Sequence, residues 1–477
     1  MPSGKSADFA SNPRRTSPGA GYSPQRGEKF FRGEDSALHS SSLPELSRPL
    51  TRLNAIAMVA GTIIGSSIFV QPSEIARYLD TPLQIMLVWA ACGVLTLFGA
   101  MVCAELASAF PQTGGVYVFL RDTCAPIAGF LWGWAMFWSM HSGIIAAIAM
   151  VFARYATFFV PAGDSGTRAI AVGIILVLSA LNYAGVKPGS RVQTALTVAK
   201  VAAIVVLVAA GLLLGTRAAA DPQAPAVMSQ AGLREFLLAM VAGLFAYGGW
   251  HMVTYTAGET RMPATVIPSA LLAGVAIVTG CYVALNLVYL HVLPLELVRS
   301  STHIAADAAD AVIGRGGSTV LAALVMISSA GALTGIVLTG PRVYYSMARD
   351  GFAPRWLGHV DPRFETPTHA IAAQAAWASV LAATGVYRQL VTRVIYTEWL
   401  FFALMAAGLF ALRRRRDYRA EYRTWGYPIV PAVFIAVSLA IVINQFIVAP
   451  REAAVGLGLV ALGAPVYYMT HAHRRLS

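Results

Sequence analysis

Apolar runs of about 20 residues recur from position 52 to the end of the chain, and the segments between them are mostly short and polar. An α-helix of that length crosses the hydrocarbon core of a bilayer. The pattern predicts an all-α polytopic membrane protein with about twelve spans, near residues 52–71, 84–110, 126–157, 168–186, 192–215, 232–257, 264–291, 318–347, 369–386, 390–412, 428–448 and 452–471.

The first predicted span has two glycines and two serines at its centre, Gly61, Gly65, Ser66 and Ser67. Glycine weakens a helix by about 1 kcal/mol, and serine offers the backbone competing hydrogen bonds. In lipid, an opened backbone group is costly unless protein, water or a ligand satisfies it. The segment therefore predicts a broken helix that forms a binding site. The alternative is a GxxxG motif for close helix packing, formed by Gly61 and Gly65.

The sixth predicted span has a similar interruption, Phe-Ala-Tyr-Gly-Gly-Trp at residues 245–250. Paired interruptions in corresponding spans of two halves indicate an inverted-repeat transporter. The pattern predicts that helices 1 and 6 unwind at mid-membrane around a central substrate site. The expected organisation is a first five-helix repeat, a second five-helix repeat and two additional helices, at residues 50–215, 230–412 and 425–472.

Charge sets the expected orientation. Only 12% of the residues are charged, about half the share of soluble domains, and the net charge is +12. With the N-terminus inside, about 24 Lys and Arg residues fall on the cytoplasmic side and about 10 outside. This asymmetry predicts that both termini are cytoplasmic. The charge is therefore attributed to orientation and to contact with anionic membrane lipid, not to nucleic-acid binding.

Residues 1–49 are rich in Ser, Pro, Gly, Arg and Glu, so we expect a disordered cytoplasmic tail without a secretory signal. A regulatory or lipid-contacting tail is the alternative. The four cysteines lack metal-ligand spacing, and we expect no metal and no cofactor. Those cysteines are Cys92, Cys103, Cys124 and Cys281.

Several stretches together carry a family resemblance. They are residues 61–69, 110–117 and 245–250, the Gly331…Gly335…Arg342 run, and the Arg413 to Arg416 run leading to Tyr427-Pro428. The chain resembles the amino acid–polyamine–organocation superfamily, and within it the bacterial type of the L-type amino acid transporter group. The resemblance covers about residues 50–470. It implies a five-plus-five inverted-repeat core with two added helices.

An amino acid needs donors for its carboxylate and acceptors for its ammonium. Unwinding of the first span would expose the amides of residues 65–67 at the N-terminus of the following half-helix, which suits a carboxylate. The freed carbonyls of Ile63, Phe245 and Gly248 would suit the ammonium. The resemblance implies the same arrangement, with the ring of Phe245 as a lid. Many relatives have glycine where this chain has Ser67, whose hydroxyl could bind the ligand or narrow the pocket.

Lys200 is the charged residue of the fifth predicted span. A charge at that depth usually faces the bundle interior with a partner, although a lysine that snorkels to the interface is the alternative. In sodium-independent relatives a lysine here occupies the place of a coupling cation. The resemblance implies that Lys200 contacts the break near Gly61 and the hydroxyl of Ser328 or Ser329, and that transport needs no sodium. Proton coupling stays open.

Glu398 is an intramembrane carboxylate of the tenth predicted span. It could bind a proton or a cationic substrate side chain, or it could pair with Arg393 in a structural role. His251 follows the second interruption and is expected near the pocket, whereas His141 is expected to be a packing residue. Residues 302–312 predict a short amphipathic outer helix, either a gate or a surface helix.

The leading hypothesis is a secondary transporter or exchanger of neutral L-amino acids in a bacterial inner membrane. The alternative is a cationic amino acid or polyamine transporter, for which proton coupling stays open. An enzyme is not expected, because the chain has no HExxH, GxSxG or GxxxxGK[ST] motif. Eukaryotic members of the group join a glycoprotein through a cysteine between spans three and four. Residues 161–168 have no cysteine, so no disulfide-linked partner is expected.

Overall fold

The structure is a computed structural model that describes residues 46–216, 231–301, 303–314, 316–385, 387–416 and 418–476. The side chains of residues 313, 387–395 and 471–476 are outside the description. The predicted tail therefore lies almost wholly outside the described residues, and so does the side chain of Arg393.

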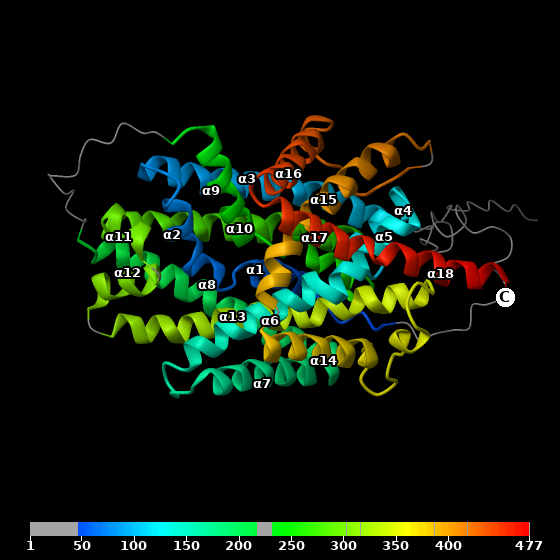
Figure 1. Ribbon diagram of the computed structural model, residues 1–477, viewed down its shortest axis with the longest axis horizontal. Helices are drawn as coiled ribbons and strands as arrows, with labels where there is room; N and C mark the ends of the chain where they lie inside the picture. The colour runs from blue at the N-terminus through cyan, green and yellow to red at the C-terminus, as the bar shows by residue number, and fades with distance from the viewer. Residues whose placement is uncertain are drawn as a thin grey trace, which may run out of the picture. The chain divides into compact units, whose positions relative to one another are not determined.

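Helices make up nearly all of the described chain (Figure 1). In its first half they are α1 (Arg52–Ile63), α2 (Gln71–Ala76), α3 (Pro82–Ala109), α4 (Val116–Thr123), α5 (Pro126–Ala135), α6 (His141–Ala156), α7 (Asp164–Tyr183) and α8 (Val186–Leu213). A π-helical turn, Met136–Met140, joins α5 to α6.

The second half begins with α9 (Leu233–Ala246), which leads into the 3₁₀ helix η5 (Trp250–Glu259). The remaining helices are α10 (Pro263–Val292), α11 (Leu295–Ser300), α12 (Ile304–Ile313), α13 (Gly317–Arg349), α14 (Thr368–Thr384), α15 (Tyr387–Arg413), α16 (Ile429–Val448), α17 (Pro450–Ala461) and α18 (Gly463–Leu476). The predicted outer helix at 302–312 corresponds to α12.

Within the described ranges, nine helices are long and apolar enough to cross a bilayer. This confirms the prediction of a polytopic all-α membrane protein. α1 and α14 are shorter, at 12 and 17 residues. The total of twelve spans and the five-plus-five repeat stay predictions.

Local sequence explains where the helices begin. α3 starts with Pro82, which needs no amide partner in the first turn, and Thr81 forms a capping box with Gln84. α1 starts in the same way, because Thr51 and Asn54 cap each other. Such caps satisfy the free amides at a helix start.

Within residues 44–477, several long helices pack against one another in pairs. α3 packs along α10, α6 along α13, and α7 along α14. α7 and α14 lie side by side along the lower edge of Figure 1. α1 packs in the interior against α8, α10 and α13, so the first broken span is surrounded by protein.

Candidate functional site

The first span is broken at the predicted place. α1 ends at Ile63, one 3₁₀ turn follows at Ser67–Phe69, and α2 begins only at Gln71. Residues 64–66 between them are not helical. The polar centre of the span is therefore a break in the helix.

The second span is broken after Ala246, where α9 ends and the chain turns through Tyr247 and Gly248 into η5. Gly249 adopts a left-handed conformation with φ of +99°. A Cβ atom there would lie 3.1 Å from the Thr62 carbonyl oxygen. Both the backbone angle and the close approach of the first span require glycine at this position.

The two breaks lie against each other. The Thr62 hydroxyl lies 3.1 Å from the Gly249 carbonyl oxygen. The Tyr282 hydroxyl, on α10, lies 3.0 Å from the Ile63 carbonyl oxygen and 3.1 Å from that of Ala246. A hydroxyl has one proton, so it donates to one carbonyl at a time. Sequence reasoning missed Tyr282, because nothing along its apolar span marks it.

Free donors are present at the first break. The backbone amides of Ser66, Ser67 and Ile68 have no hydrogen-bond partner among the described residues. The amide of Gly65 donates to the Ile63 carbonyl at 2.8 Å, so it is already engaged. The donor set that the structure offers to an anion is thus one residue further along the chain than predicted.

The predicted acceptors differ in availability. The Ile63 carbonyl already has two donors near it, the Gly65 amide and the Tyr282 hydroxyl. The Phe245 carbonyl accepts from the Gly248 amide at 3.2 Å. The Gly248 carbonyl has no partner in the described part of the chain. The Phe245 side chain is 41% exposed.

Lys200 is fully buried, and its ammonium nitrogen lies at the first break. It donates to the carbonyls of Gly61 at 2.7 Å, Ile64 at 2.5 Å and Ser328 at 3.3 Å. Three donors therefore meet three acceptors, which an ammonium requires when it is removed from water. This geometry differs from a lysine that snorkels to the interface.

The hydroxyls predicted around Lys200 have other positions. The Ser328 hydroxyl donates to the carbonyls of Ile64 or Gly65, at 3.2 and 3.0 Å, and it is the Ser328 carbonyl that faces Lys200. The Ser329 hydroxyl is buried without a described partner. Sequence reasoning located the residue pair but could not assign which of its atoms faces the break.

Of the two glycines in the GxxxG motif, Gly61 permits close helix packing and Gly65 does not. A Cβ atom on Gly61 would lie 2.1 Å from Gln193 Nε2 and 2.3 Å from Thr197 Oγ1, so α1 packs closely on α8 there. A Cβ atom on Gly65 would have its nearest neighbour at 3.6 Å. Gly61 thus permits packing, whereas Gly65 lies in the break itself.

The structure does not expose His251 at the break. Its ring is fully buried among four aromatic rings, those of Trp132, Trp250, Tyr255 and Phe402. Neither ring nitrogen has a described partner, and the same is true of the buried His141. A substrate-contacting role for His251 stays a prediction.

Glu398 lies on α15 and is buried, with 7% of its surface exposed. Its Oε1 atom has no partner among the described residues. The proposed pairing with Arg393 falls outside the description. The carboxylate therefore keeps an unused acceptor inside the bundle.

A buried ion pair closes one end of the broken spans. Arg342, on α13, binds Glu259 with two hydrogen bonds of 2.8 and 2.9 Å, and both side chains are fully buried. The backbone at Glu259 is also hydrogen-bonded to the segment just before α1, since the Leu50 amide donates to the Glu259 carbonyl at 3.0 Å. The start of α1 and the end of η5 therefore meet at this end.

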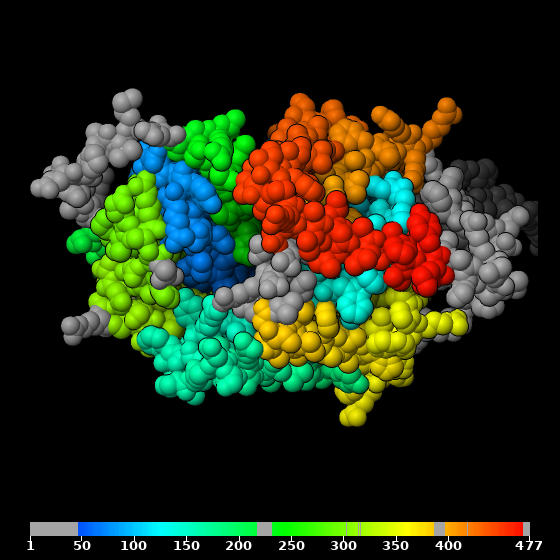
Figure 2. Space-filling view, viewed as in Figure 1, coloured from blue at the N-terminus to red at the C-terminus, as the bar shows by residue number. Residues whose placement is uncertain are grey.

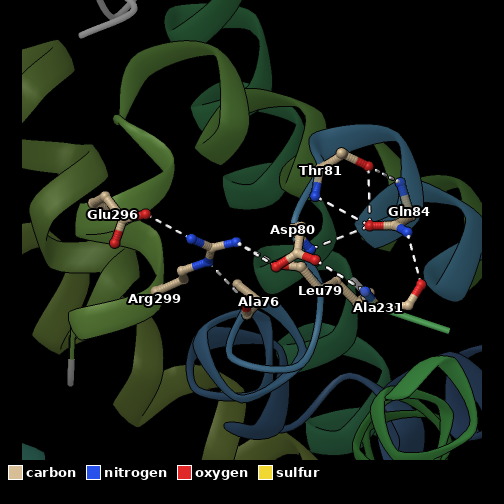
Figure 3. A network of polar contacts seen from close by, with 8 residues as sticks. All are labelled: Ala76, Leu79, Asp80, Thr81, Gln84, Ala231, Glu296 and Arg299. Carbon is tan, nitrogen blue, oxygen red and sulfur yellow. Dashed lines mark hydrogen bonds and ion pairs between the residues drawn. The ribbon is translucent and has the colours of Figure 1, made fainter. Parts of the chain in front are cut away.

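A polar network joins the opposite ends of the same spans (Figure 3). Arg299, on α11, donates to the carbonyls of Ala76 at 3.2 Å and Leu79 at 2.8 Å, and its Nη2 lies 3.5 Å from Asp80 Oδ1. Asp80 Oδ2 accepts from the Ala231 amide, just before α9, at 3.0 Å. The network thus connects the end of α2, the start of α9 and α11.

These features define a multi-pass helical membrane protein with two broken spans around a central polar site. The amino acid permease family profile matches residues 50–469. The serine/threonine exchanger SteT of Bacillus subtilis (strain 168) is 30% identical over 427 residues, covering 89% of this chain and 97% of the relative. The chain belongs to the amino acid permease family.

Two further relatives are amino acid transporters of animals. The b(0,+)-type amino acid transporter 1 of Rattus norvegicus is 29% identical over 457 residues, with 93% of this chain and 92% of the relative covered. The cystine/glutamate transporter of Homo sapiens is 28% identical over 434 residues, with 89% and 85% covered. The similarity thus extends over nearly the full length of each relative.

Proposed function

We propose that the protein is an amino acid antiporter that works by alternating access. The observation that carries the proposal is the pair of adjoining breaks, with unpaired amide donors on one broken span and an unpaired carbonyl acceptor on the other. Family membership and the names of the relatives, among them exchangers of serine and threonine, support it.

In the proposed complex the substrate carboxylate binds the amides of Ser66, Ser67 and Ile68. These amides precede α2, whose N-terminal dipole end favours an anion. The ammonium binds the Gly248 carbonyl, and the Ile63 carbonyl joins when the Tyr282 hydroxyl turns to Ala246. The exposed ring of Phe245 covers the bound molecule.

The proposed architecture is a five-plus-five repeat inside residues 50–412, followed by two further helices. The packing of the long helices supports it. The pairs α3 with α10, α6 with α13 and α7 with α14 each join a span to the span five places later. The two broken spans also run in opposite directions, because the start of one meets the end of the other at both ends.

In the proposed transport cycle, the half-helices on one side of the breaks open while those on the other side stay closed. The buried pair of Arg342 and Glu259 closes the end that we assign to the cytoplasm. At the outer end, Asp80 and Arg299 tie α2, α9 and α11 together, so that they move as one gate. Substrate drives the cycle because closure around it makes contacts that the open state lacks.

Sodium independence follows from the place of Lys200 in the proposal. Its ammonium already occupies a carbonyl-lined position at the first break, so a coupling cation has no vacant site there. Uptake by reconstituted protein is expected to be unchanged when choline replaces sodium. A sodium-dependent rate would contradict this role.

Neutral L-amino acids are the proposed substrates, with serine and threonine the first to test. Glu398 supports the alternative of cationic substrates, because it is a buried carboxylate with an unused acceptor oxygen. Glu398→Gln separates the two: loss of lysine or arginine uptake with serine uptake retained favours the cationic alternative.

The main experiment is exchange in proteoliposomes. Labelled L-serine uptake is expected to rise several-fold when unlabelled L-serine is inside, and L-serine is expected to compete whereas its carboxamide, which lacks the carboxylate, does not. A rate that is independent of internal amino acid would reject antiport. Competition by the carboxamide as strong as that of serine would reject the carboxylate site.

We also place the protein in a bacterial inner membrane with both termini cytoplasmic, without a disulfide-linked subunit. The distribution of Lys and Arg supports the orientation. The lack of cysteine in residues 161–168 supports the partner proposal. A covalent heterodimer on a non-reducing gel would contradict it.

A further inference from the structure

The segment between α15 and α16 concentrates positive charge. Six arginines fall within eleven positions: Arg413, Arg414, Arg415, Arg416, Arg419 and Arg423. The segment connects α15 to α16, and α16 is long and apolar enough to cross a bilayer, so we expect the side chains that precede α16 to lie near the lipid headgroups. In Figure 2 it is drawn in orange and projects from the surface at the upper right.

The segment is fixed to the bundle through Glu105, near the end of α3. This buried carboxylate accepts hydrogen bonds from Arg413 at 2.8 and 2.6 Å, from the Tyr418 hydroxyl at 2.9 Å and from the Thr424 amide at 2.6 Å. Burial is the main cause that raises the pKa of the Tyr418 hydroxyl, and the negative charge of the nearby Glu105 carboxylate is the second. The hydroxyl therefore stays a neutral donor. The backbone of this arginine-rich segment is thus held in place at several points.

The arginines divide into two groups. Arg413 binds Glu105, and Arg415 donates to the Asp122 carbonyl at 3.1 Å. The other four are exposed and form no ion pair with any part of the chain that the structure describes: Arg414, Arg416, Arg419 and Arg423. Four cations are therefore presented to an outside partner on a fixed segment.

Two exposed apolar side chains follow these cations along the chain. Trp425 is 78% exposed and Ile429 is 70% exposed. Tryptophan is enriched at the boundary between hydrocarbon and headgroups, where its ring has both an apolar body and a polar N–H. Exposed cations beside an exposed tryptophan at a helix start match an anionic headgroup and its glycerol region together.

We propose that residues 414–416 and 418–429 form a docking site for an anionic phospholipid of the surrounding leaflet. The exposed arginines bind the phosphodiester headgroup, and Trp425 inserts beside it. Clusters of arginine next to a membrane helix attract such lipids with about 1 kcal/mol per residue, which corresponds to a factor of about five in affinity. Because Glu105 is on α3, the bound lipid is linked to the helix that follows α2.

The test uses the full chain in nonionic detergent, titrated with phosphatidylglycerol, phosphatidylcholine or inorganic phosphate, with the melting temperature as readout. Phosphatidylglycerol is expected to raise it more than phosphatidylcholine. The test variant combines four substitutions: Arg414→Gln, Arg416→Gln, Arg419→Gln and Arg423→Gln. It is expected to need at least tenfold more phosphatidylglycerol for the same rise, and to melt normally without added lipid.

The matched control removes the same charge from exposed arginines elsewhere in the chain: Arg52→Gln, Arg191→Gln, Arg355→Gln and Arg363→Gln. It is expected to respond to phosphatidylglycerol like the unmodified protein. An equal loss in the control overturns the proposal, because the effect is then one of overall charge. A response to inorganic phosphate as large as that to the lipid also overturns it, since the site is then a free-anion site.

Trp425→Ser provides a second variant that leaves every arginine in place. It is expected to weaken the response to phosphatidylglycerol several-fold without changing the response to phosphate. An unchanged lipid response would remove the tryptophan from the site. None of these readouts depends on transport, so their failure is separate from failure of the proposed exchange activity.

Discussion

The broken first span consists of two helical segments, α1 and α2. At the C-terminal end of each segment, a cationic side chain from another helix binds backbone carbonyls. At the end of α1, Lys200 binds the Gly61 and Ile64 carbonyls. At the end of α2, Arg299 binds the Ala76 and Leu79 carbonyls. In both cases the reason is that the last carbonyls of a helix lack intrahelical partners and the dipole there favours a cation.

The two ends differ in their access to water. Lys200 is fully buried and has carbonyl partners alone, whereas the Arg299 side chain is 24% exposed and lies near two carboxylates. Water can replace a lost partner at the second end but not at the first. The comparison teaches that the same helix-end chemistry is costly to remove in the interior and cheap to remove at the surface.

The largest effect is expected from Lys200→Met. Two or three buried carbonyls lose their donor at about 1–3 kcal/mol each, so exchange of serine is expected to fall by about a hundredfold or more. Uptake in proteoliposomes is the measurement. Lys187→Met is the matched control, because Lys187 is exposed near the start of the same helix. Retained exchange in the Lys200 variant would contradict the comparison.

A smaller effect is expected from Ser328→Ala. The Ser328 hydroxyl is buried and donates to the carbonyls of Ile64 or Gly65, and the loss of one such bond costs about 1 kcal/mol. A fivefold to tenfold fall in exchange rate is expected by the same measurement. Ser329→Ala, in which the hydroxyl removed has no described partner, serves as the control and is expected to leave the rate unchanged.

Arg299→Met is the substitution at the partly exposed helix end that corresponds to Lys200→Met in the interior. It is expected to destabilise the contacts at the end of α2 by about 0.5–1 kcal/mol, which lowers the exchange rate by a factor of two to five. Water replaces the guanidinium at the Ala76 and Leu79 carbonyls. The deficit of the variant relative to the unmodified protein is expected to shrink as salt rises, because added ions weaken the exposed contacts of Arg299 with Asp80 and Glu296. An effect as large as that of Lys200→Met would mean that burial does not distinguish the two ends.

The smallest effect is expected from Glu74→Ala. Its partner Arg77 is three residues further along the chain, at the C-cap of α2, and both side chains are more than 40% exposed. Exposed ion pairs of this kind contribute at most a few tenths of a kcal/mol to the free energy of unfolding. A melting temperature and an exchange rate close to those of the unmodified protein are expected; a clear fall in either would show a role for Glu74 beyond this pair.

Features carried by a short stretch of chain were predictable. The glycines and serines of residues 61–67 and the paired glycines of residues 245–250 predicted both breaks, and the isolated charge of Lys200 predicted a buried cation. Each signal is local, because a helix that cannot hold its hydrogen bonds is weak whatever surrounds it.

Features that depend on which atom faces which could not be predicted in this way. Tyr282 bridges the two breaks because α10 packs against both α1 and η5, and Arg299 reaches Ala76 at the end of α2 from 223 residues away along the chain. His251 directly follows the second break, but its position along the chain does not specify which neighbours its ring has. The turn of η5 directs the ring into an aromatic cluster.

The sequence by itself determined that this chain crosses the membrane many times and interrupts two of its spans, because apolar length and glycine content act within each helix. Tertiary structure alone decided which freed backbone groups remain available. The Gly65 amide and the Ile63 carbonyl are already engaged, while the amides of Ser66 and Ser67 have no described partner. The physical reason is that a buried hydrogen-bonding group is satisfied by whatever packs against it, and that neighbour comes from a distant part of the chain.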